Sequence, residues 1–123
     1  MQVGDPMTDD PYARIRAICL ALPETSERLS HGEAPWFVGR RTFAMAADHH
    51  HDDRRAIWLA APDGAQASLV ATDPERFFRP PYVGVRGWIG VYLDVPVDWD
   101  ELERLLVDAH RLIAPPRLAR RLG

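Results

Sequence analysis

A β-hairpin pattern constrains the fold of this chain more than any other feature. Residues 36–38 are aromatic and β-branched, which is typical of a strand, and residues 42–47 continue with apolar alternation. Gly39 and Arg40, which lie between them, have the length and composition of a two-residue hairpin turn. The pattern therefore predicts two antiparallel strands joined by a tight turn. On the second strand, one face is expected to carry Phe43, Met45 and Ala47.

Two helical patterns flank the predicted strands. The first begins at Asp10 and Pro11, a cap residue and a proline suited to a first turn, and ends at Pro23. The second begins at Asp98, which is followed three residues later by Glu101 as in a capping box. Each helix has an apolar stripe at helical spacing, which predicts a buried face. The stripes consist of Tyr12, Ile15, Ile18, Cys19 and Leu22 in the first helix, and of Trp99, Leu102, Leu105, Leu106, Ala109, Leu112 and Ile113 in the second.

The segments between these patterns complete the predicted fold. We expect a polar connection over residues 24–30, a third strand over 55–60, a short helix over 65–71, a strand over 88–93 and a last helical turn over 117–122. This order predicts the α+β class, with an antiparallel meander of about four to five strands. The N-terminal and C-terminal helices are expected to pack on one face of that sheet.

Length and composition indicate one domain. A chain of 123 residues can bury a single core, and we expect residues 1–7 to be a disordered leader and residues 8–123 to form the domain, with Met7 as an alternative start. No stretch approaches the roughly 20 apolar residues of a membrane span. The N-terminus lacks the basic and apolar regions of a secretory signal, so we expect a cytoplasmic protein.

The charge of the chain is unevenly distributed. The formal net charge is −3, and all 15 basic residues are arginine. Residues 94–109 sum to −5, whereas residues 110–123 sum to +4. A protein that is acidic overall can therefore still present a basic face.

Several motifs occur together in a fixed order along the chain. They are Leu22-Pro23-Glu24, His31-Gly32-x-x-Pro35-x-Phe37, Gly39-Arg40-x-Thr42-Phe43-Ala44, Phe77-Phe78-x-Pro80-Pro81-Tyr82-Val83-Gly84-x-x-Gly87-Trp88-Ile89-Gly90-Val91 and Ala109-x-x-Leu112-Ile113-Ala114-Pro115. With them the chain resembles the MmcQ/YjbR family of small bacterial proteins over residues 12–122. The resemblance implies an α+β fold similar to the bacterial frataxin fold. It also implies a DNA-binding label that rests on a winged, hairpin-bearing shape, which is an analogy of fold.

Arginines at the predicted turns form the first candidate site. Guanidinium groups can contact phosphates, and phosphate neutralisation supplies most of the non-specific affinity for nucleic acids. The alternative is that these arginines are solvated turn residues without a ligand. Trp36 and Trp58 would stack on bases if they faced outward, and they would belong to the core if buried. The candidate nucleic-acid-binding residues are Arg40, Arg41, Arg54, Arg55, Arg117, Arg120 and Arg121.

A site for a small ligand or a protein partner is the alternative hypothesis. Glycines at positions 84, 87 and 90 predict a close backbone approach, either of a ligand or of a neighbouring strand. His31 at the start of the hairpin could act as an acid, a base or a ligand contact near neutral pH, although such a residue more often fastens a loop by hydrogen bonds. The candidate pocket residues are His31, Trp36, Tyr82 and Trp88.

The sequence offers little support for metal binding or catalysis. His49, His50 and His51 lie between acidic residues, but adjacent loop residues seldom converge into a metal site, so we expect a solvated loop and assign no metal. We recognise no catalytic motif and predict a non-catalytic protein with no cofactor. Cys19 is expected to be a buried thiol, and His110 a half-exposed structural residue. We expect a monomer or a weak dimer with no membrane partner.

Overall fold

Six β-strands form one open antiparallel sheet in the structure, a computed structural model that describes residues 10–28, 33–48 and 54–122. The strands lie in the order β1-β2-β3-β4-β6-β5. The predicted α+β class is confirmed, with one or two strands more than expected. The predicted leader over residues 1–7 lies outside the described residues. The strands are β1 (Thr25–Glu27), β2 (Glu33–Val38), β3 (Arg41–Asp48), β4 (Arg55–Leu59), β5 (Phe77–Phe78) and β6 (Ile89–Tyr92).

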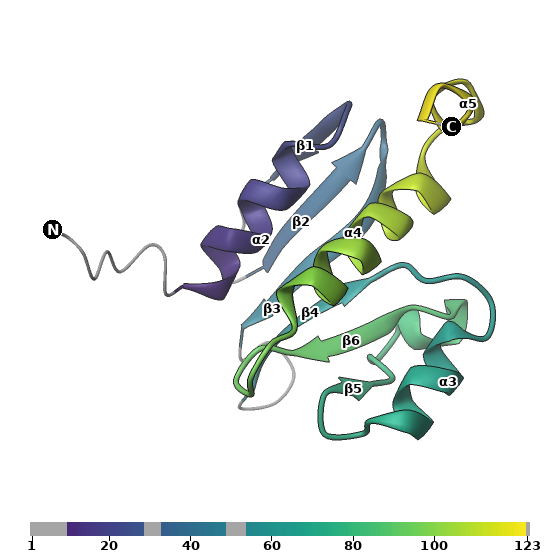
Figure 1. Cartoon of the computed structure of the whole chain (residues 1–123). Coiled ribbons are helices and arrows are strands. Elements are labelled where there is room, and N and C mark those ends of the chain that lie inside the picture. The colour runs from purple at the N-terminus through teal and green to yellow at the C-terminus, as the bar shows by residue number, and fades with distance from the viewer. Residues whose placement is uncertain (1–9, 29–32, 49–53, 123) are drawn as a thin grey trace, which may run out of the picture.

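The two long helices cover the same face of the sheet, as the sequence predicts (Figure 1). They are α2 (Pro11–Leu20) and α4 (Trp99–Ile113). Asp10 and Asp98 cap them through their side chains, because each carboxylate accepts a backbone N–H of the first turn, at 3.0 and 3.1 Å. Three shorter helices complete the fold: α3 (Ala65–Thr72), η1 (Val83–Arg86) and α5 (Pro116–Leu122).

The hydrophobic core lies between the sheet and these two helices. Ile15 and Cys19 of α2 and Leu102 and Leu106 of α4 are fully buried. Burial raises the pKa of Cys19 to about 12, so this thiol packs as an apolar group and the expected buried thiol is confirmed. The sheet contributes a row of paired, buried residues that runs across four strands: Trp36, Ala44, Leu59 and Ile89.

Three of the tryptophans are core residues. Trp36, Trp58 and Trp88 expose only 1%, 4% and 4% of their surface. Base stacking needs an open ring face, so the stacking interpretation of Trp36 and Trp58 is wrong and the core interpretation is correct. Among the described residues, no helix combines the length and the apolar character needed to cross a membrane.

A β-bulge interrupts the hairpin. Ala44 pairs with Trp36 and Thr42 pairs with Phe37, so the register skips Phe43. The ring of Phe43 meets the His110 ring of α4 edge-on, with 5.4 Å between the centroids. The strict alternation predicted for this strand therefore fails at Phe43, because a bulge adds one residue to one side of the ladder.

Two edge strands were missed by the sequence patterns. β1 lies inside the segment predicted to be a polar connection, because three polar residues show no alternation. It exists through pairing with β2, where Thr25 lies opposite Val38. β5 has only two residues, Phe77 and Phe78, which is too short for a recognisable pattern.

Candidate functional site

The arginines of this protein divide between the two ends of the sheet. Because neighbouring strands are antiparallel, β2, β4 and β5 end where β3 and β6 begin. The connections at this end of the sheet, together with α5, contain most of the exposed arginines. We call this end of the sheet the arginine end. The opposite end, where β3 and β6 finish, is called the acidic end. The arginine end contains Arg40, Arg41, Arg79, Arg86, Arg117, Arg120 and Arg121, and the acidic end contains Asp10, Asp73, Glu75, Asp94 and Asp98.

The C-terminal helix α5 lies close to the β2–β3 turn (Figure 1). Gly39, at a φ of 62°, donates its N–H to the carbonyl oxygen of Glu24 at 3.2 Å. A Cβ atom on Gly39 would lie 3.7 Å from Cγ of Pro115, which precedes α5. The guanidinium group of Arg117 in α5 donates a hydrogen bond to each carboxylate oxygen of Glu24, both at 2.9 Å. The hairpin turn and the C-terminal helix therefore meet, although they are far apart in the sequence.

His110 anchors the same region from inside. It is 1% exposed, and its Nε2 atom lies 2.8 Å from the carbonyl oxygen of Pro23. A carbonyl only accepts hydrogen bonds, so Nε2 carries the proton and donates it. The expectation that His110 is half-exposed is wrong, because Phe43 and the chain at Pro23 cover it. A buried hydrogen bond thus joins the last turn of α4 to the segment that leads into Glu24.

Positive charge at the arginine end is only partly compensated. Arg117 lowers the pKa of Glu24, chiefly by hydrogen bonding to its carboxylate. Besides Glu24, Asp63 is the acidic residue on the described connections of this end. Among the described residues of this end, six exposed arginines form no ion pair: Arg40, Arg41, Arg79, Arg86, Arg120 and Arg121.

Arg54 and Arg55 lie at the acidic end, away from the other candidates. Arg54 forms a two-point ion pair with Asp94, at 2.7 and 3.0 Å, and its guanidinium lies 3.4 Å from the ring centroid of Tyr92. This pairing lowers the pKa of Asp94. Arg55 pairs with Asp10 at 3.3 Å. The structure therefore brings Arg40, Arg41, Arg117, Arg120 and Arg121 together and places Arg54 and Arg55 elsewhere.

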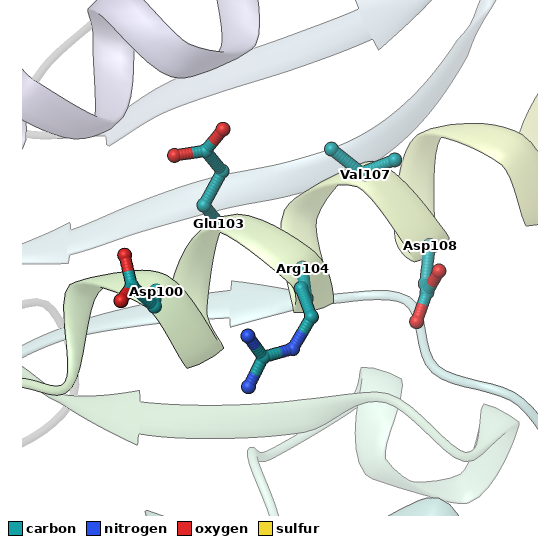
Figure 2. Close-up of a pocket in the computed structure, with 5 residues that line it drawn as sticks. All are labelled: Asp100, Glu103, Arg104, Val107 and Asp108. Atoms are coloured by element: carbon teal, nitrogen blue, oxygen red, sulfur yellow. The ribbon is translucent and has the colours of Figure 1, made fainter.

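The outer surface of α4 is acidic. A shallow hollow of about 360 Å³ lies on this helix, and all the side chains that line it come from α4 (Figure 2). Carboxylates outnumber the single guanidinium there, so a polyanion approaching this face meets repulsion. The lining residues are Asp100, Glu103, Arg104, Val107 and Asp108.

The candidate pocket residues do not converge. Trp36 on β2 and Trp88 before β6 are buried three strands apart, whereas Tyr82 is 79% exposed. His31 lies outside the described residues, as do the three histidines at positions 49–51. A second hollow, of about 680 Å³, lies at the acidic end beside Arg54 and Asp73, and none of these aromatic residues lines it or the hollow on α4. In the described parts of the chain, no group of three or more potential ligands is arranged to hold a metal ion.

Gly84 and Gly90 make room for neighbouring side chains. A Cβ atom on Gly84 would lie 2.7 Å from Cγ of Arg79, and one on Gly90 would overlap the ring of Phe78. The close approach predicted from these glycines therefore involves protein neighbours.

Arg79 and Arg86 belong to the arginine end but were absent from the sequence candidates. Both lie in the connection between β5 and β6, where Arg79 precedes η1 and Arg86 is its last residue. Connections between neighbouring antiparallel strands alternate between the two ends of a sheet, but β4 and β5 are not neighbours and run in the same direction. Counting strands along the chain therefore does not predict that this connection lies at the same end as the Gly39 turn.

The fold and the distribution of charge define a two-layer α+β protein with one basic end. The chain belongs to the YjbR family, because the family model described as YjbR matches residues 20–112. Its structure is similar to the crystal structure of the Deinococcus radiodurans protein DR2400, which has a domain of the family DUF419. The TM-score is 0.70 at 22% sequence identity, over 90% of this chain and 82% of that chain, so the likeness is one of fold. No curated protein matches the chain significantly.

Proposed function

We propose that this YjbR-family protein binds nucleic acid through contacts between the arginine end and backbone phosphates. The observation that carries the proposal is the meeting of the β2–β3 turn with α5, which gathers exposed arginines from distant parts of the sequence. Planar guanidinium groups suit phosphate oxygens because they donate two parallel hydrogen bonds.

The separation of charge explains how a protein with a net charge of −3 can bind a polyanion. Carboxylates concentrate at the acidic end and on the outer face of α4, so they orient the molecule with its arginine end toward the ligand. Phosphate contacts position a protein on nucleic acid without reading bases. The proposed binding is therefore independent of sequence and sensitive to salt.

A small-ligand site remains the alternative proposal, and it has less support. Two of its candidate residues, Trp36 and Trp88, are core residues with closed ring faces, and Tyr82 is isolated from them on the surface. The exposure of Tyr82 would also suit a protein partner, but the arginines around it, Arg79 and Arg86, favour a polyanion.

The test is a salt titration with a short mixed-sequence DNA duplex, followed by fluorescence anisotropy. The double variant Arg40→Ala/Arg41→Ala should bind about tenfold more weakly, and the slope of log affinity against log salt should fall by about 0.9 for each lost phosphate contact. Arg104→Glu is the control, because it changes the net charge by the same −2 on the acidic face of α4. Absence of binding at low salt, or an equal loss in the control, contradicts the proposal.

A further inference from the structure

The connection between β5 and β6 presents two exposed apolar side chains at the arginine end. Tyr82 and Val85 are 79% and 78% exposed, the highest values among the large apolar residues of the described chain. Burying such side chains is normally favourable, so their exposure on an ordered loop requires a reason.

Tyr82 also has an unusual backbone conformation. Its φ and ψ are 63° and −65°, and the N–H of Val83 donates to the carbonyl oxygen of Pro81 at 2.6 Å. These values define a γ-turn with positive φ, which is rare and strained for a residue with a side chain. Strained residues persist where the surrounding structure holds them, and they occur most often at functional sites.

The contacts that hold this loop are well defined. The side-chain amide of Gln66 donates to the carbonyl oxygens of Gly84 and Trp88, at 2.8 and 2.6 Å. Gly84 is also buried against the side chain of Arg79 within the same loop, and the hydrogen bonds from Gln66 fix the middle of the loop to α3. The backbone is thus fastened around Tyr82 while its ring remains exposed, which is the arrangement of a pre-organised contact residue.

The surroundings of Tyr82 are cationic. Arg79 and Arg86 flank it in the sequence and are exposed, and no acidic residue lies between residues 76 and 93. β6 is separated from β3 by one strand, so this connection and the arginines of the Gly39 turn lie at the same end of the sheet. An exposed aromatic ring beside a cationic surface is the combination that binds single-stranded nucleic acid.

We propose that Tyr82 stacks on an unpaired base and makes single-stranded nucleic acid the preferred ligand of the arginine end, an inference that rests on the proposed function. The arginines hold the backbone phosphates, while the ring takes one base. Bases in a duplex are stacked on both faces, so they offer Tyr82 no partner without unstacking. Stacking tolerates every base, so this preference adds no sequence specificity.

The test compares three ligands of equal length at the same low salt: oligothymidylate, the corresponding abasic oligonucleotide and a duplex. The abasic ligand retains the phosphates and lacks the bases, so it isolates the contribution of stacking. The wild-type protein should bind oligothymidylate about 5-fold to 100-fold more tightly than the abasic ligand.

Three variants test whether the Tyr82 ring causes the preference for oligothymidylate over the abasic ligand. Tyr82→Gly removes the ring and suits a positive φ, so it should fold normally and bind oligothymidylate and the abasic ligand equally. Tyr82→Phe keeps the ring and should retain the preference. Arg40→Ala/Arg41→Ala should weaken binding to all three ligands while the ratio between oligothymidylate and the abasic ligand persists.

The outcomes separate this inference from the proposed function. Equal wild-type affinity for oligothymidylate and the abasic ligand overturns the inference without relying on any variant, and so does a preference that survives in Tyr82→Gly. If binding nevertheless depends on salt and on Arg40 and Arg41, the proposed function stands. If no ligand binds, both are overturned.

Discussion

The two ends of the sheet use the same residue type in different ways. At the acidic end, Arg54 is held in an ion pair with Asp94, and Arg76 is held in ion pairs with Asp73 and Glu101. At the arginine end, Arg117 alone has an ion pair described, with Glu24, while Arg40 and its neighbours extend without one. The first arrangement serves the fold, whereas the second leaves cationic groups ready for a ligand.

In this protein the role of an arginine depends on its position in the fold more than on the net charge of the chain. Half-exposed ion pairs contribute only about 0–1 kcal/mol each, so the acidic end gains little stability from its pairs. Clustered like charges at the arginine end repel one another and slightly destabilise the compact state. Apart from Arg117, the described arginines of this cluster form no ion pair that offsets the cost, which supports the proposed anionic ligand.

The largest expected effect on stability concerns His110, whose buried contacts hold the segments of the arginine end together. His110→Ala removes the hydrogen bond to Pro23 and the packing against Phe43, so the free energy of unfolding should fall by about 2–4 kcal/mol. Leu112→Ala, two residues along the same helix, is the control, because that side chain is 51% exposed. Urea denaturation measures both. Equal losses of unfolding free energy in the two variants would show that the buried contacts of His110 contribute no more than the packing of a half-exposed side chain.

A smaller effect should distinguish the arginines of the two ends. Arg54→Ala breaks an ion pair and a cation–π contact, so it should lower the free energy of unfolding by about 1 kcal/mol. Arg40→Ala breaks no ion pair and should change stability by less than about 0.5 kcal/mol. Thermal denaturation of the two variants checks the difference. A greater loss in Arg40→Ala would assign that residue a structural role.

Removing a carboxylate should sharpen the contrast in binding. Glu24→Gln releases Arg117 and raises the net charge of the arginine end, so affinity for DNA should rise about threefold at low salt. Asp94→Asn makes the same change in charge at the acidic end and releases Arg54, but it should leave affinity nearly unchanged. Anisotropy titrations compare the two. Equal gains would mean that position is irrelevant.

The smallest expected effect is common to both ends. The pKa values of Glu24 and Asp94 are lowered in the folded protein, chiefly by hydrogen bonds from Arg117 and Arg54. The stability that these pairs contribute is therefore fully present above the unfolded pKa of about 4 and is lost as pH falls through the lower folded values. Urea midpoints measured from about pH 6 to pH 2 should show this loss, and Asp94→Asn should reduce it. A midpoint that rises on acidification would contradict the assignment.

Strong periodic patterns allowed much of the fold to be predicted. The hairpin at Gly39 and the helices after Asp10 and Asp98 follow from turn chemistry, caps and apolar spacing. Tertiary context decided the rest. His110 and Leu112 both lie on α4, about 80° to either side of the centre of its buried stripe, yet one is buried and the other is half-exposed. The difference comes from the segments that pack beside each residue, and helical spacing gives no information about those segments.

The candidate site was predictable in part. Turn and terminal arginines such as Arg40 and Arg120 are visible in the sequence, but their meeting depends on contacts between Gly39, Pro115 and Glu24. The strained turn at Tyr82 has no signal in residue types, because positive φ at a tyrosine is unfavourable in itself.

Resonance-by-resonance NMR titration with a short oligonucleotide tests the central claim most directly. If the arginine end binds nucleic acid, the backbone amide resonances of Gly39–Arg41 and of α5 will shift on binding, while those of residues 54–55, 73–76 and 94–101 will not. Shifts centred on the acidic end, or none at either end at low salt, would contradict it.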